Sequence, residues 1–191
     1  MNKLCPFFNI IFLSLLLITG NAGAQVAFDR STDSYWENNS GWRIFSYPAE
    51  DMCEMTKNPL PEEHFTLAYF PRDKTFGLVF TNANATSLES GSSVRLHVIL
   101  KKDGQVDQSW GVRNFEISKT EGSVAFSIFL KAPIHTDIAQ SESISIFRED
   151  SLGKPLAVAF VGLDGSGEAT EKLIACAITT AKLKPNDPFL K

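Results

Sequence analysis

Near the C-terminus the chain runs Leu156-Ala157-Val158-Ala159-Phe160-Val161, six apolar residues between Pro155 and Gly162. A short apolar run with turn-forming residues at both ends predicts a strand, and its lack of alternation predicts one buried on both faces. A glycine-rich turn at 162–167 follows. Between Glu168 and Thr180, one set of residues recurs at helical spacing and defines a face: Ala169, Leu173, Cys176, Ala177 and Thr180. We expect a helix here, with Ser166 as its N-cap and Cys176 facing inward.

The cysteines predict how this helix is held. The chain has Cys5, Cys53 and Cys176, and Cys5 lies in a segment that we expect to be removed. Cys53 and Cys176 then have a single possible pairing. They lie too far apart in sequence for the close spacing typical of redox or metal-binding pairs. We therefore expect a structural disulfide that joins the C-terminal helix to the beginning of the sheet.

The N-terminus has the three parts of a secretory signal peptide: Lys3, an apolar core from about Ile10 to Leu17, and the small residues Ala22-Gly23-Ala24. We expect cleavage between Ala24 and Gln25. The alternative, a retained membrane anchor, requires about 18 or more apolar residues, and polar residues interrupt this run. We also expect no transmembrane anchor in the mature chain, and a periplasmic or secreted location, where a disulfide persists.

Charge argues against two classes of partner. Lys3 is the only charged residue of 1–24, so the mature chain would carry 17 basic residues (18 − 1) against 22 acidic ones, a net charge of −5. Nucleic acid and anionic lipid both reward clustered cations, and the chain has no long run of Lys or Arg. We expect neither as its main partner.

The middle of the chain has the patterns of strands. Alternating apolar residues occur at Val94, Leu96, Val98 and Leu100, and again at Val124, Phe126, Ile128 and Leu130. Two apolar runs, 65–70 and 76–80, flank the turn residues 71–74 and predict a hairpin. Closely spaced strands with one late helix predict a mainly β (β-rich α+β) fold, an antiparallel sheet or sandwich capped by one C-terminal helix. The expected organisation is a signal peptide (1–24), a polar, loosely held N-terminal lead-in (25–41), a single β-rich domain (42–181) and a C-terminal tail (182–191).

Some stretches predict less regular structure. Cys53 is expected in an irregular segment, followed by a loop at Asn58-Pro59-Leu60-Pro61. The segment 106–110 is expected to pair back on 94–100, and 115–117 to form a separate short strand.

The residues with chemical potential form no recognisable reactive group. Asp164-Gly165-Ser166-Gly167-Glu168 resembles the middle of a calcium loop, but Gly162 and Leu173 occupy positions that require carboxylates. Ser166 lacks the G-x-S-x-G frame of a hydrolase nucleophile. The histidines His64, His97 and His135 have no metal-ligand spacing, and His97 is expected on the outer face of its strand. We therefore expect no catalytic residue, cofactor or metal site.

Three short motifs carry a resemblance to a known group of proteins. They are Trp42…Cys53, then Ser87-Leu88-Glu89-Ser90-Gly91 before a strand, and Leu163-Asp164-Gly165-Ser166…Ala169…Leu173…Cys176. Over residues 42–177 the chain resembles small exported proteins of Gram-negative bacteria, mostly uncharacterised and distantly similar to invasion-associated locus B proteins. Ala85 stands where these proteins often have an aromatic residue before the Ser-Leu pair. The further cysteines of the invasion-associated proteins are also missing. The resemblance implies a periplasmic β-rich domain with a terminal cysteine pair and no agreed activity.

These observations favour a non-enzymatic interaction or envelope-accessory protein whose partner is a periplasmic or envelope protein. The residues expected to contact a partner or ligand are the aromatic side chains Trp36, Trp42, Trp110 and Phe189. One alternative is a small-ligand-binding module with the tryptophans as walls. A further alternative is an uncharacterised hydrolase, with His64 and Ser166 as the residues to test.

Overall fold

The computed structural model describes residues 36–60, 63–85, 87–120, 122–131 and 133–181. The expected signal peptide, most of the lead-in, and the tail with Phe189 lie outside the described residues.

Ten strands in this part of the chain form one antiparallel sheet, in the order β1-β2-β3-β4-β5-β8-β7-β6-β9-β10. The strands are β1 (Trp36–Glu37), β2 (Arg43–Tyr47), β3 (Met52–Leu60), β4 (Glu63–Phe70), β5 (Thr75–Asn82), β6 (Ser93–Lys102), β7 (Gln105–Thr120), β8 (Ser123–Leu130), β9 (Ser143–Glu149) and β10 (Pro155–Gly162). The predicted mainly β, antiparallel fold is confirmed. So is the hairpin of β4 and β5, in which Phe70 pairs with Thr75.

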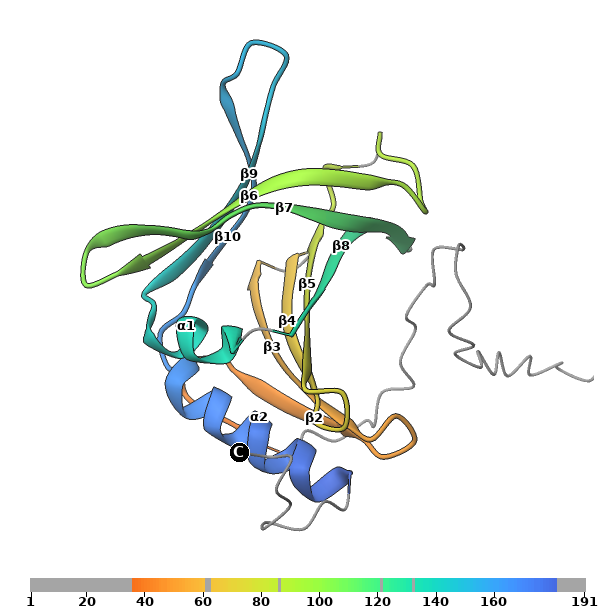
Figure 1. Ribbon diagram of the computed structural model, residues 1–191, viewed down its shortest axis with the longest axis vertical. Helices are drawn as coiled ribbons and strands as arrows, with labels where there is room; N and C mark the ends of the chain where they lie inside the picture. The colour runs from red at the N-terminus through yellow and green to blue at the C-terminus, as the bar shows by residue number, and fades with distance from the viewer. Residues whose placement is uncertain (1–35, 61–62, 86, 121, 132, 182–191) are drawn as a thin grey trace, which may run out of the picture.

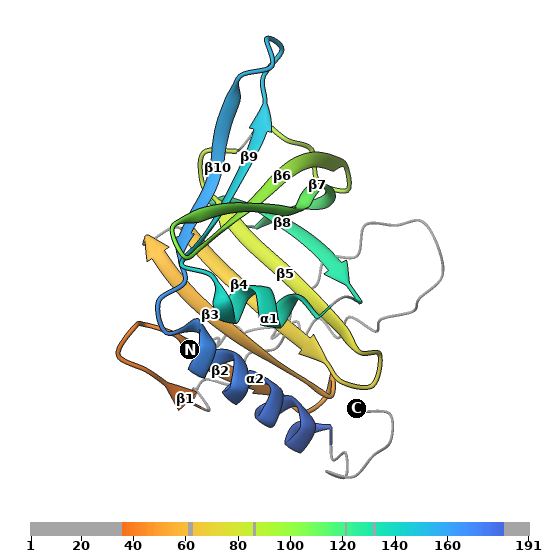
Figure 2. The same cartoon turned by 60° about the vertical axis from the view of Figure 1, so that its left-hand side comes forward.

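The sheet is strongly curled, so that β6 and β7 cross over β3, β4 and β5 (Figures 1 and 2). The inner face of the curl holds the core, whose fully buried side chains include Trp42, Ile44, Phe65, Leu67, Leu78, Phe80, Leu96, Leu100, Phe115 and Phe126. The alternation in β6 decides which residues enter it, because Leu96, Val98 and Leu100 are buried while Arg95 and Lys101 are exposed.

The curl brings the last strand, β10, back toward β3 and β5, but it pairs only with β9. Side chains join it to the other strands. Lys57 Nζ donates to the carbonyl of Gly162 at 2.9 Å, and Asn82 Nδ2 donates to that of Val158. We call these two bonds the seam. Two carbonyls of the edge strand are thereby satisfied without a neighbouring strand.

Two helices cover one end of the curled sheet, one of them the predicted C-terminal helix. They are α1 (Ile134–Gln140) and α2 (Ser166–Thr180), and α2 packs on β2, β3, β4 and α1 (Figure 2). The inward face of α2 is the predicted one, with Ala169, Leu173, Cys176 and Ala177 buried. Neither helix is long and apolar enough to span a membrane, within the residues described.

The predicted disulfide between Cys53 on β3 and Cys176 on α2 is present, with 6.1 Å between the Cα atoms. It closes a loop across a sequence separation of 123 residues. On the chain-entropy treatment such a loop contributes about 5 kcal/mol as an upper figure. The bond fastens the last helix to the third strand.

The predicted N-cap of α2 is wrong. The capping residue is Gly165, at φ +76°, and Ser166 is already helical. The Ser166 hydroxyl, fully buried, donates to the carbonyl of Ile138 at 2.9 Å. This serine therefore bonds α2 to α1 rather than to its own helix.

Three further expectations about elements are corrected. Cys53 and residues 58–60 belong to β3, whose pairing with β4 shifts between Lys57 and Leu60, and such an irregularity accommodates a proline. The segments expected as two strands form one, β7, which contains a bulge opposite Val98 and Leu100. In the lead-in, Trp36–Glu37 pairs with β2 and so belongs to the sheet.

The prediction that the run 156–161 is buried on both faces is also wrong. It forms β10 as expected, but Leu156 is 40% exposed and Phe160 61% exposed. The physical reason is its position: β10 is the edge strand, and its hairpin with β9 projects beyond the rest of the sheet (Figure 1). Only Val161, at the end nearest the helices, is buried.

Candidate functional site

The tryptophans expected as ligand walls mostly serve the core. Trp42 is completely buried, packs edge-to-face on Phe65, and donates its indole N–H to the carbonyl of Asp164 at 2.8 Å. Trp110 is 6% exposed and donates to Asp137 Oδ2 at 2.8 Å. Trp36 is half-buried and packs against the same core. Because the polar atoms of Trp42 and Trp110 are used internally, these two positions contradict a role as walls of an open site.

The two residues of the hydrolase interpretation have other uses. Ser166 is buried and its hydroxyl is bonded to α1, so a substrate cannot reach it as a nucleophile. His64 is exposed at the start of β4, with its Nδ1 2.7 Å from Asn58 Oδ1. Across the described ranges no group of three or more His, Cys, Asp or Glu side chains is placed to hold a metal ion.

The other two histidines stack on aromatic rings. His97 lies on the outer face of β6, as predicted, stacked on Phe147 with ring centroids 4.8 Å apart and its Nε2 3.5 Å from Glu149. His135 stacks on Phe76 at 4.9 Å, and its buried Nδ1 has no hydrogen-bond partner in the structure. Burial lowers the pKa of His135, and the nearby Asp137 carboxylate partly offsets this.

A groove of about 250 Å³ opens on the inner face of the sheet, among residues of β5, β6, β8, β9 and β10. Its apolar lining comes from three separate parts of the chain and includes Leu88, Val94, Leu96, Phe126, Leu156 and Val158. Polar side chains lie at its edges, namely Asn82, Asn84, Ser87 and Arg148. We call this site the groove. Concave, mostly apolar sites with a few polar groups are the usual form of small-ligand pockets.

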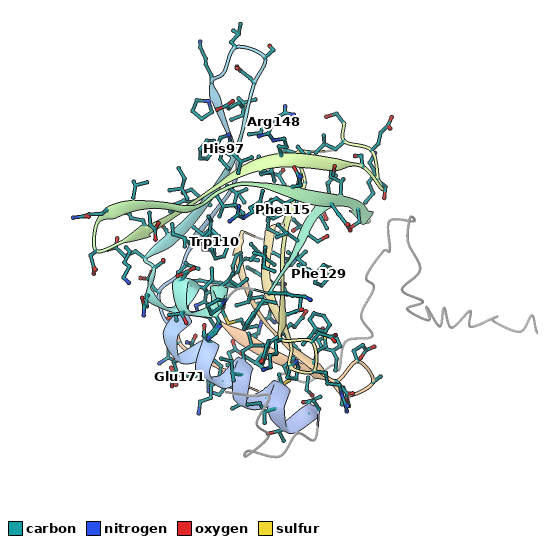
Figure 3. All side chains as sticks on the ribbon, in the orientation of Figure 1. His97, Trp110, Phe115, Phe129, Arg148 and Glu171 are labelled. Carbon is teal, nitrogen blue, oxygen red and sulfur yellow. A yellow bond between two sulfur atoms is a disulfide. The ribbon has the colours of Figure 1, made fainter. Side chains whose placement is uncertain are left out.

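Arg148 provides the charge of the groove. It pairs across the sheet with Leu156, and the residues on either side of it on β9 face outward, so both side chains lie on the inner face beyond the core. Arg148 is exposed and forms no ion pair with any described residue. Figure 3 places it at the base of the projecting hairpin, close to His97 on the opposite face. A free guanidinium at an apolar groove suits a carboxylate.

The outer face of the same strands carries a second feature. Cross-strand pairing puts Ile99 of β6, Ser145 of β9 and Phe160 of β10 in one row, and the neighbouring row contains the stacked pair of His97 and Phe147. Phe160 is the most exposed of these side chains. We call Ile99, Phe147 and Phe160 the outer patch.

These features define a mainly β protein with one curled sheet, a helix fastened to it by a disulfide, an inner groove and an outer apolar patch. No protein-family model matches the chain, and no curated protein sequence matches it. Among solved structures it is similar to invasion associated protein B from Bartonella henselae. The TM-score is 0.52 at 17% sequence identity, over 73% of this chain and 95% of the other. At this identity the similarity concerns the fold, and it agrees with the resemblance seen in the sequence.

The groove was not predicted from the sequence. Its residues come from five strands, β5, β6, β8, β9 and β10, and from positions 84, 85, 87 and 88 of the connection after β5, and only the curl brings them together. The one usable signal was Arg148, a cation in a strand whose neighbours Ile144 and Ile146 are apolar and on the same face.

Proposed function

We propose that this chain is an exported, non-enzymatic interaction protein of the periplasm or envelope, which binds a partner protein through the outer patch. The observation that carries the proposal is Phe160, an aromatic side chain that is 61% exposed on an edge strand of a projecting hairpin. Aromatic side chains are enriched at protein interfaces and dominate their binding energy.

The outer patch gives Phe160 an apolar surrounding. Ile99 and Phe147 are half-buried in the same two rows, so a partner that covers Phe160 also removes parts of these side chains from water. Burying one phenylalanine side chain is worth about 1.5–3 kcal/mol. Contiguous apolar side chains exposed on a protein surface often mark an interaction site. The outer patch at the sheet edge therefore supports a protein partner.

The proposed location rests on two supports. The signal-peptide pattern of residues 1–24 predicts export, and the Cys53–Cys176 bond suits an oxidising compartment. The similar solved structure is titled as invasion-associated, but a likeness in fold alone assigns no such role to this chain.

Site-specific photocrosslinking in the producing cell tests the proposal. A photoreactive residue at position 160 is compared with one at Val106, an apolar residue of β7 with the same 61% exposure. We expect a discrete protein adduct from position 160 and none from position 106. Ile99→Ser, two strands away in the same cross-strand row, should reduce the adduct at 160.

Equal adducts from both positions, or none from position 160, would overturn the partner surface. Fractionation of the same cells tests the location separately: the protein is expected with the periplasmic fraction and shortened by the residues before Gln25. Recovery of full-length protein in the cytoplasm would contradict export.

A further inference from the structure

We propose that the groove binds a medium-chain aliphatic carboxylate, with the alkyl chain along its apolar lining and the carboxylate at Arg148. This site lies on the inner face of the sheet, so it is independent of the outer patch and of the proposed partner.

The lining accounts for the alkyl chain. Leu88, Val94 and Val158 are half-buried at the edge of the core, while Leu96 and Phe126 form its fully buried floor. Asn82 offers a ligand little, because its amide N–H already donates to Val158 and its Oδ1 accepts from the backbone N–H of Asn84. Apolar groups make up only somewhat more than half of the exposed lining, which suits a ligand with an alkyl part and one polar end rather than a sugar or a nucleotide.

The volume limits the length of this chain. At about 250 Å³ the groove is below the roughly 300–1,000 Å³ of typical ligand pockets, so it suits a short alkyl chain. The ligand is consequently close to octanoate in size, smaller than a membrane lipid.

Arg148 is the reason to expect a carboxylate on the ligand. The neighbouring acidic groups on its hairpin are engaged elsewhere, since Glu149 lies beside His97 and Asp150 accepts the backbone N–H groups of Leu152 and Lys154. The guanidinium is thus available to a ligand, and its planar fork matches a carboxylate. A neutral or cationic head group would leave this match unused.

The test is an NMR titration of the mature protein with straight-chain alkanoates of increasing length, each below its micelle concentration. Each added methylene should tighten binding about fourfold, up to a limit near eight carbons. The shifted resonances should fall within residues 82–85, 87–88, 94–96, 148 and 156–158. Octan-1-ol, which has the chain without the charge, should bind up to about fivefold more weakly than octanoate.

Variants locate the two halves of the site. Arg148→Ala should weaken octanoate up to about fivefold and leave octan-1-ol unchanged. The matched control is Arg95→Ala, which removes an equal charge from the outer face of β6 and should change neither ligand. Ala85→Phe places a ring in the groove and should abolish binding of both, and Val158→Phe, at a half-buried lining position of β10, serves the same purpose from the other side.

Binding that does not depend on chain length, or that Arg148→Ala leaves unchanged, would overturn the assignment. So would octanoate binding that survives both ring-introducing variants with their thermal unfolding intact, because the ligand would then lie outside the groove.

Discussion

At the scale of single residues, the surroundings of His135 make the stability of the fold depend on pH. It lies against Phe76 with its Nδ1 buried and without a partner in the structure. Burial lowers its pKa, so the folded state favours the neutral ring. The stability that follows is fully present above the unfolded pKa of about 6.5 and is lost as the pH falls through the lower folded value.

His135→Phe should therefore reduce the pH dependence of folding. The phenyl ring keeps the stack on Phe76 and cannot be protonated. Between pH 7.5 and pH 5.5 the free energy of unfolding of the wild type should fall more than that of the variant, as measured by urea denaturation at both pH values. Equal losses in the two proteins would show that His135 is not responsible.

The sequence predicted some residues correctly because local alternation, or the absence of another candidate partner, was sufficient. His97 was placed on an outer face from the alternation of β6 alone, and Cys53 and Cys176 could pair only with each other. Trp42 and Trp110 were misjudged as candidate ligand walls, because whether an indole is in the core or at the surface depends on distant partners. Their N–H groups bond to Asp164 and Asp137, which lie 122 and 27 residues away in sequence.

At the scale of elements, the start of α2 depends on Gly165. Its φ of +76° is in the left-handed region, and a Cβ there would lie 2.7 Å from Ser40 Oγ and 2.8 Å from Ser40 Cβ. Gly41 has a similar φ of +80° but nothing within 4 Å of a Cβ. Alanine substitutions at Gly165 and Gly41 can therefore separate the backbone cost of a positive φ from the steric cost of the added Cβ.

Gly165→Ala should destabilise the protein more than Gly41→Ala does. The backbone cost of an alanine at positive φ is about 1–2 kcal/mol at either site, and only Gly165 adds the clash with Ser40. In chemical denaturation, the double variant Gly165→Ala with Ser40→Gly should recover part of the difference. If the two single variants were equally stable, the contact with Ser40 would carry no cost.

Strands were predictable where one face is buried and the other solvated, as in β6 and β8. Prediction failed where an element departs from that pattern. β3 ends at Asn58, Pro59 and Leu60, residues that indicate a loop when only neighbours in sequence are considered. β10 is apolar on both faces, and only its place at the edge of the sheet leaves Phe160 in water.

At the scale of the whole molecule, the curl is closed by the seam rather than by backbone pairing. Lys57 reaches Gly162, with its Nζ 5.3 Å from the centre of the Trp42 ring, and Asn82 reaches Val158. Burial lowers the pKa of Lys57, and the nearby Asp164 carboxylate partly offsets this lowering. The Lys57 end of the seam is therefore partly removed from water. A single hydrogen bond of this kind contributes about 0.5–1.5 kcal/mol.

Asn82→Ala should loosen β10 without unfolding the sheet. Amide hydrogen exchange in β10 is expected to accelerate, while exchange in β4 and β5 stays unchanged. Asn84→Ala is the matched control, because the side chain of Asn84 is exposed and donates no hydrogen bond to a described residue. Identical exchange in the two variants would mean that the seam does not hold the strand.

The groove could not be predicted from sequence, because it exists only in the curled sheet. Arg148, Leu88 and Phe126 lie far apart in the chain and belong to different elements, and no period or spacing relates them. The overall fold class was predictable because it needs only the count and type of elements.

The bond between Cys53 and Cys176 also sets an order in time. A ribosome makes the chain from its N-terminus, so the sulfur of Cys53 exists for 123 residues of synthesis before its partner does. At about 5–20 residues per second this interval is roughly 6–25 s. During it every strand from β4 to β10 is made. A product that ends early, before α2, can therefore never acquire the crosslink, and the oxidised protein is by its chemistry a complete one through residue 176.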